Sequence, residues 1–226
     1  MSATRTISLL GGTGPEGKGL AARFAAAGEQ VVIGSRSAER AKSAADEVGR
    51  LFGEPGVVPA VSGVSNQEAA REGTLVFLCV PFSGQAAVLS QCTDLLADKI
   101  AVSVVAPITF ANGKLGLELL AAGSAVEEAA KSVPNARWVA GFHTLPARDL
   151  ARVQRPMETD ALICSDDDEA KHVVMALAEA IEGLRAVDAG PLTSARYLEA
   201  ATALLININR IHRTQASLRI VGLRKT

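Results

Sequence analysis

The sequence has few of the features that mark secreted, metal-binding or nucleic-acid-binding proteins. Its 226 residues include three cysteines, widely spaced and without a CxxC pair, which argues against both a disulfide framework and a zinc site. Lysine and arginine number 23 against 24 acidic residues, so a net charge of −1 gives no electrostatic basis for binding nucleic acid. We therefore expect no resident metal and no nucleic-acid partner.

Long apolar runs are absent as well. None approaches the ~20 residues that a membrane helix needs, and residues 1–12 pass into a strand-like run that leaves no room for a signal peptide. Hydrophobic residues make up 48% and charged residues 21%, an ordinary globular mixture. These features predict a cytoplasmic protein without a membrane partner.

Apolar runs alternate with helical segments along the first two-thirds of the chain. The expected strands are 5–11, 30–34, 56–61, 74–80, 99–105 and 136–142, and the expected helices are 15–28, 37–53, 65–73, 84–96 and 124–133. Strands that are apolar throughout, rather than at alternate positions, are typical of parallel sheets covered on both faces. The pattern predicts an α/β fold with a Rossmann-type doubly wound parallel sheet.

The regular alternation of strand-like and helical segments changes after residue 142. An irregular connector at 143–160 is followed by an expected strand at 161–165, a helix at 166–181, a strand at 184–190 and a long helix from about 194. We expect a Rossmann domain over 1–142 and a small C-terminal α/β domain over 143–226. The last helix is apolar nearly all round over 197–208, which fits either a subunit or domain interface or a central core helix.

A glycine motif follows the first expected strand. The stretch Gly12–Gly17 matches GxGxxG between a strand and a helix, the context that indicates a dinucleotide site. In such sites the first glycine allows a tight turn, the second admits a pyrophosphate, and the third lets helix and strand pack. The free N–H groups of the helix start face the phosphates. The glycines assigned to these three roles are Gly12, Gly14 and Gly17.

The end of the second expected strand suggests which dinucleotide binds. Related sites place an acid about 20 residues after the glycine motif, on the adenosine ribose, whereas this chain has Ser35, Arg36 and, one turn later, Arg40. Hydroxyls and guanidinium groups there favour the 2′-phosphate of NADP. The alternative is a solvated arginine on a loop.

Other strand ends share the same edge of the sheet. Val80 and Ala106 follow two of the expected strands, so we expect them to line the ribose and nicotinamide. His143 follows the last strand of the first domain and is a candidate for the floor of a cleft. A lone histidine is more often structural.

Four segments together resemble one known family, the F420-dependent NADP reductases. They are "LLGGTGPEGKGLAARFAAAGEQVVIGSR", "FHTLPA", "SDDDEAK" and "IEGLRAVDAGPL", and they run in family order over nearly the whole chain. The resemblance implies hydride transfer between NADP and the deazaflavin coenzyme F420 in a homodimer or higher oligomer.

The resemblance also implies roles for individual residues. Ser35, Arg36 and Arg40 would contact the 2′-phosphate. The residues that would lie at the other cofactor phosphates are Thr13, Gly14, Pro15 and Glu16. His143, Leu145 and Ala147 would lie where nicotinamide meets deazaflavin, with Leu145 pressing the rings together and His143 hydrogen-bonding a ring carbonyl. Two alternatives stay open: an NADPH-dependent reductase of another small acceptor on the same scaffold, and a non-catalytic NADPH sensor.

The acidic run Ser165–Glu169 has a simpler interpretation than a metal cluster. Ser165 followed three residues later by an acid fits a helix cap, since acids are favoured at the positive end of a helix dipole. We expect this segment to start a helix.

Overall fold

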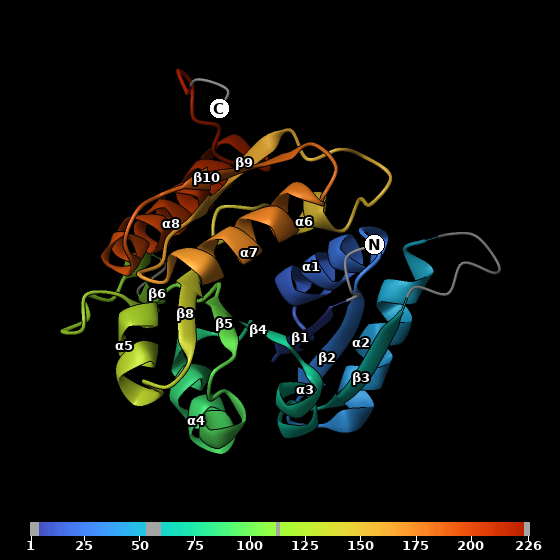
Figure 1. Ribbon diagram of the computed structural model, residues 1–226. Helices are drawn as coiled ribbons and strands as arrows, with labels where there is room; N and C mark the ends of the chain where they lie inside the picture. The colour runs from blue at the N-terminus through green and yellow to red at the C-terminus, as the bar shows by residue number, and fades with distance from the viewer. Residues whose placement is uncertain (1–4, 53–59, 112–113, 224–226) are drawn as a thin grey trace.

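The computed structural model describes residues 5–52, 60–111 and 114–223 (Figure 1). Six strands form one parallel sheet: β1 (Thr6–Leu10), β2 (Gln30–Ser35), β3 (Val61–Ser65), β4 (Leu75–Leu78), β5 (Ile100–Ser103) and β8 (Arg137–Ala140). Their order across the sheet is β3-β2-β1-β4-β5-β8, and each neighbouring pair is parallel. The predicted doubly wound α/β architecture is confirmed.

Side chains from successive strand positions enter two buried layers. Ile7 and Leu9 of β1 pack into one layer, and Leu10 packs into the other. The first layer is covered by α1 (Pro15–Ala26), α2 (Ala38–Arg50) and α7 (Asp168–Glu179). The second is covered by α3 (Asn66–Glu72), α4 (Phe82–Cys92), α5 (Ala125–Ser132) and the start of α8 (Ala195–His212). Burial on both faces explains why the strands are apolar throughout.

The third strand is the least well predicted of the six. The expected strand at 56–61 falls largely on residues 53–59, which lie outside the described part of the chain. The strand that pairs with β2 is β3, with Val31 opposite Val61 and Ser35 opposite Ser65. Its carboxyl end is therefore Ser65, and this places Asn66 at the ligand-binding edge.

Three elements between residues 104 and 151 were not predicted. Strands β6 (Ile108–Ala111) and β7 (Lys114–Leu117) form an antiparallel hairpin apart from the main sheet. Within the expected irregular connector, Ala147–Leu150 form the short helix α6. Helix α6 packs against α1.

The C-terminal segment contains a second βαβ unit. Strands β9 (Thr159–Ile163) and β10 (Leu184–Asp188) pair in parallel with α7 between them, and one antiparallel bridge joins Ala140 of β8 to Cys164. Buried side chains of α7 share a layer with those of α1 (Figure 1). The division into two domains at residue 142 stays a prediction.

The acidic run before α7 does cap a helix, although Ser165 is not the capping residue. The N-cap of α7 is Asp167, which accepts a hydrogen bond from the backbone N–H of Ala170 at 2.9 Å. Ser165 instead donates to the carbonyl oxygen of Trp138 at 2.6 Å and accepts from the N–H of Asp167. Its hydroxyl therefore ties the helix start to β8.

Helix α8 has one buried and one exposed apolar face, which accounts for its unusual sequence. Leu198 and Leu205 are buried, whereas Tyr197, Leu204 and Ile211 are 70%, 58% and 74% exposed. Among the described helices, none is long and apolar enough to cross a membrane.

Candidate functional site

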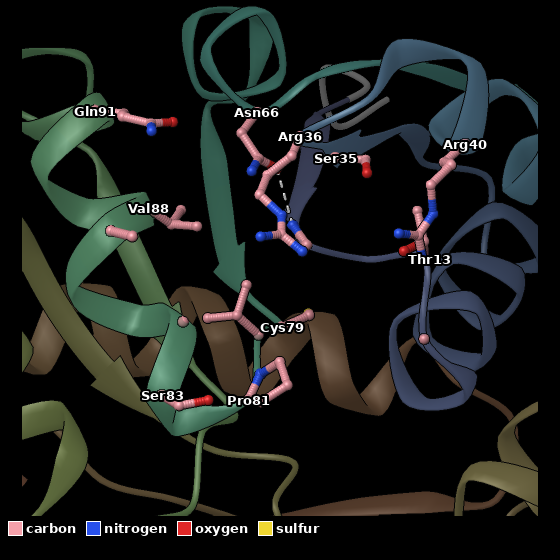
Figure 2. A pocket seen from close by; sticks show the side chains of 15 residues that line it. Thr13, Ser35, Arg36, Arg40, Asn66, Cys79, Pro81, Ser83, Val88 and Gln91 are labelled. Atoms are coloured by element: carbon pink, nitrogen blue, oxygen red, sulfur yellow. Dashed lines mark hydrogen bonds between the residues drawn. The ribbon is translucent and has the colours of Figure 1, made fainter.

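The carboxyl ends of β1, β2 and β4 surround a pocket of about 470 Å³, which we call the nucleotide pocket (Figure 2). Strand order reverses on either side of β1, the position where open α/β sheets bind ligands. The pocket brings together six of the residues assigned from sequence: Thr13, Gly14, Ser35, Arg36, Arg40 and Val80. Gly12 and Gly17 are buried beneath the loop.

The glycines of the loop have roles that differ in part from those predicted from the GxGxxG motif. Gly11, which was not assigned a role, is the turn residue with a φ of +69°. A Cβ on Gly17 would lie 2.5 Å from the Cα of Gly12, so these two residues let helix and strand pack. A Cβ on Gly14 would meet no atom within 4 Å. Gly14 therefore leaves open space where a phosphate would approach.

Helix α1 presents an uncapped amino terminus at this position. Its N-cap is Gly14, which has no side chain to satisfy the first N–H groups, and Pro15 occupies the first turn, where a missing N–H costs nothing. The remaining N–H groups and the positive end of the helix dipole suit an anionic group.

Two guanidinium groups also line the nucleotide pocket. Arg36 follows the last residue of β2, and Arg40 lies in the first turn of α2; both are exposed, and their side chains extend into the hollow in Figure 2. Within the described residues, neither guanidinium forms an ion pair. Ser37 caps α2 by accepting from the N–H of Arg40 at 3.3 Å. Ser35 is buried beside them.

Asn66 is a pocket residue that sequence reasoning missed. Its side chain is 4% exposed, and its Oδ1 accepts a hydrogen bond from the N–H of Gly11 at 3.0 Å, the dashed line in Figure 2. Asn66 thereby fixes the turn that opens the glycine loop. Correct placement of the third strand would have put Asn66 at the strand's carboxyl end.

The far wall of the nucleotide pocket comes from α4 and the turn before it. Pro81, Ser83 and Gln91 line this wall, and none of them was predicted. Cys79, at the end of β4, lines the floor. Burial raises the pKa of its thiol well above the usual range, and the charge of Glu16 raises it further. Cys79 is therefore a poor nucleophile.

A second pocket of about 230 Å³, which we call the acceptor pocket, lies between the turn after β8 and helix α8. Its lining includes four residues assigned from sequence: Glu16, His143, Leu145 and Ala147. Thr202, Asn209 and Gln215 line the other side and were not predicted. Two predicted residues lie elsewhere. Pro15 lines another depression with Lys18, and Ala106 contributes to neither pocket.

His143 is held rigidly at the base of the acceptor pocket. The preceding residue, Phe142, has a φ of +67°, a backbone conformation that is uncommon outside glycine and that often marks functional sites. The His143 side chain is 5% exposed, its Nε2 lies 3.2 Å from the carbonyl oxygen of Val105, and its own carbonyl accepts from Thr202 Oγ1 at 3.0 Å. The buried Nδ1 has no partner among the described residues.

The hydrogen bond to Val105 determines which imidazole nitrogen of His143 carries the proton. A carbonyl oxygen only accepts, so Nε2 carries the proton. Burial lowers the pKa of His143 to about 4, which leaves the ring neutral near pH 7 and Nδ1 as a bare acceptor. The sequence reasoning expected His143 to hydrogen-bond a ring carbonyl, but this tautomer has no free N–H to offer one.

Glu16 links the two pockets. It lines the acceptor pocket, and its charge acts on Cys79 of the nucleotide pocket. Its Oε1 is buried without a partner among the described residues. Burial raises the pKa of this carboxyl to about 8, so it is mostly neutral at pH 7. Sequence reasoning had placed Glu16 at the cofactor phosphates only.

A buried arginine fixes the connector that follows the acceptor pocket. Arg23 of α1 is 3% exposed, and its guanidinium donates to four backbone carbonyl oxygens. They belong to Asp149, Leu150, Arg152 and Arg155, at 2.7, 3.0, 2.8 and 2.8 Å. Helix α1 therefore contacts the nucleotide pocket through its N-cap, Gly14, the acceptor pocket through Glu16, and the connector through Arg23 two turns later.

Comparison with known proteins identifies the family. Residues 6–107 match the family model described as NADP oxidoreductase, coenzyme F420-dependent. The F420-dependent NADP reductases of Methanothermobacter thermautotrophicus and Methanocaldococcus jannaschii are 39% and 35% identical to the chain; each alignment covers 96% of this chain, and 95% and 98% of the relatives. A crystal structure of a protein from Arthrobacter sp. FB24 has the same fold, with a TM-score of 0.82 and 23% identity over 97% of this chain and 100% of that one. The chain belongs to the F420-dependent NADP reductase family.

Proposed function

We propose that this protein transfers a hydride between NADP(H) and the deazaflavin coenzyme F420. The family is that of NADP-dependent oxidoreductases that use F420. The observation that carries the proposal for this chain is the pair of guanidinium groups, Arg36 and Arg40, in a pocket that also includes the uncapped start of helix α1.

The nucleotide pocket fits NADP at each of its charged positions. The pyrophosphate would lie at the open space over Gly14, against the N–H groups of α1. Arg36, Arg40 and the start of α2 would hold the 2′-phosphate. An acid at position 36 would repel the 2′-phosphate and accept hydrogen bonds from the ribose hydroxyls of NAD. Arg36 pairs with the phosphate instead and therefore favours NADP over NAD.

The acceptor pocket fits the place where two ring systems meet. NADPH supplies the hydride when it is bound. The protein has to hold donor and acceptor carbons about 3–3.5 Å apart and exclude water. Leu145 is buried at this pocket and lies next to the His143 turn. Its side chain would restrict the ring positions, while α8 closes the opposite side.

We also propose a homodimer through α8. The exposed Tyr197, Leu204 and Ile211 follow one another at seven-residue intervals, the repeat of a helix that pairs along its length. A second copy presents the same stripe, so a two-fold axis would pair like with like. Leu204→Glu would then convert the dimer to a monomer in sedimentation equilibrium. A wild-type chain that sediments as a monomer would exclude this interface.

The direct test mixes the purified protein with NADPH and oxidised F420 and follows the fall in deazaflavin absorbance. Bleaching with NADPH and little with NADH supports the proposal, and equal rates with both would contradict the role of Arg36 and Arg40. Tight NADPH binding without bleaching would favour the two alternatives. Screening imines and other electron acceptors would then separate a reductase of another substrate from an NADPH sensor. With its cysteines free in the structure, we place the reaction in the reducing cytoplasm.

A further inference from the structure

We propose that Glu16 and His143 form a paired binding site for an amide edge, in which His143 Nδ1 accepts a ligand N–H and the neutral Glu16 carboxyl donates to the ligand carbonyl oxygen. This inference rests on the proposed function, because both cofactors named there present such an edge. Nicotinamide carries a primary carboxamide, and a deazaflavin carries an N–H flanked by carbonyls in its pyrimidine ring.

Two unsatisfied atoms in one pocket carry the inference. Among the described residues only four buried side-chain polar atoms have no hydrogen-bond partner, and Glu16 Oε1 and His143 Nδ1 are two of them. Both residues line the acceptor pocket. An unsatisfied buried polar group costs about 1–3 kcal/mol, so two of them in one small pocket point to a ligand that pairs with both.

The polarities of the two groups are complementary to an amide. His143 can only accept at Nδ1, because its Nε2–H is committed to Val105. A protonated carboxyl can donate its O–H. A ligand that meets both needs adjacent N–H and C=O groups. A phosphate or carboxylate has no donor for Nδ1 and would bring a charge against the half-buried, neutral carboxyl of Glu16.

The surroundings keep Glu16 neutral. The titratable groups that face it are Cys79 from β4 and His143 after β8, and neither is a cation at neutral pH. Helix α8 and the C-terminal segment contribute the uncharged Thr202, Asn209 and Gln215 to the pocket. On its own helix, Lys18 is paired with Glu47. A pyrophosphate at the start of α1 would favour the neutral carboxyl further.

Neutral Glu16 makes binding dependent on pH. With a pKa of about 8, the free protein loses the carboxyl proton as pH rises above that value, and the amide-binding form must first regain it. Affinity for the amide-bearing ligand should therefore fall by up to about tenfold per pH unit above 8. Binding near pH 9 should take up about one proton per site.

Calorimetric titration with NADP⁺ near pH 9, in two buffers of different ionisation enthalpy, measures that proton uptake without catalysis. Wild type should take up a proton, and Glu16→Gln, which keeps an N–H donor but cannot ionise, should take up none. Glu72→Gln is the control, since it removes an exposed acid of α3 that lines neither pocket; it should behave as wild type. Adenosine 2′,5′-bisphosphate, which lacks the carboxamide, measures the proton uptake that the phosphates alone cause; wild type should take up more protons with NADP⁺ than with this ligand.

The same design distinguishes the two sources of the amide. If nicotinamide occupies the site, Glu16→Leu weakens NADP⁺ about three- to tenfold. The acetylpyridine analogue, which lacks the N–H for His143 but keeps the carbonyl for Glu16, binds wild type more weakly than NADP⁺ does and still loses affinity in Glu16→Leu. If the deazaflavin occupies it, NADP⁺ affinity is unchanged and the KM for F420 rises above pH 8 in wild type but not in Glu16→Gln. If wild type binds both cofactors with an affinity that does not depend on pH, the inference is overturned. Proton uptake with NADP⁺ but no F420 bleaching would reject the proposed function and leave the amide site standing.

Discussion

Replacing Arg23 by methionine tests how the acceptor pocket is held in place. Methionine keeps the buried apolar stem but removes every donor from four carbonyl oxygens. Hydrogen bonds to a charged group contribute about 1.5–3 kcal/mol each, although carbonyls in the exposed connector regain water and the arginine no longer has to be desolvated. We expect a net loss of about 3–5 kcal/mol in the free energy of unfolding, typical of removing one partner from a buried charged network.

Thermal unfolding and urea titration measure that loss. For a chain of this size each kcal/mol corresponds to about 2–4 °C, so the melting temperature should fall by about 10 °C. Arg152→Met is the control: its guanidinium is exposed and pairs only with Asp149 among the described residues, so its loss should stay below about 1 kcal/mol. Affinity for adenosine 2′,5′-bisphosphate should be unchanged in Arg23→Met, because the connector does not line the nucleotide pocket. A melting temperature within 2 °C of wild type would refute the reasoning.

Three further changes test other parts of the structure. Arg36→Ala should raise the KM for NADPH about ten- to a hundredfold and leave that for NADH unchanged in steady-state assays; equal losses would mean that the arginine supports the fold. Gly14→Ala should preserve the melting temperature but lower the affinity for NADPH in fluorescence titrations. Gly17→Ala should lower the melting temperature because its Cβ meets Gly12. The reverse pattern would contradict the roles assigned to these two glycines. Glu16 has a pKa raised from 4.5 to about 8 in the folded state, so its contribution to stability is complete below about pH 4.5 and is lost as pH rises toward 8. Glu16→Gln should therefore lose less stability than wild type between pH 5 and 8 in urea titrations, and parallel profiles would exclude a buried neutral carboxyl.

Elements with strong local signals could be predicted from the sequence. Apolar runs gave five of the six strands of the main sheet, and glycine and proline marked the ends of α1. The hairpin of β6 and β7 was missed although Asn112-Gly113, a pair typical of two-residue hairpin turns, separates its strands in the sequence. Its strands are short and lie apart from the main sheet, so neither strand length nor apolar character distinguished them.

Site residues that depend on distant contacts could not be predicted in the same way. Arg23 looks like an ordinary charged position on an amphipathic helix, and only the fold reveals the carbonyls 126 to 132 residues away that bury it. The glycine motif places Glu16 beside phosphates but says nothing about the acceptor pocket on its other side. The donor and acceptor roles of His143 follow from Val105, a neighbour that strand prediction alone does not supply.

The two pockets come from separate parts of the chain. All residues that line the nucleotide pocket lie between Gly11 and Gln91, whereas those of the acceptor pocket lie between His143 and Ala216, with Glu16 as the exception. A single crossover between the genes of two relatives, placed in the hairpin region around 108–117, would thus exchange one pocket and leave the other unchanged. Chimeric enzymes built this way could combine the coenzyme preference of one parent with the electron acceptor of another, provided that position 16 is transferred together with the second half.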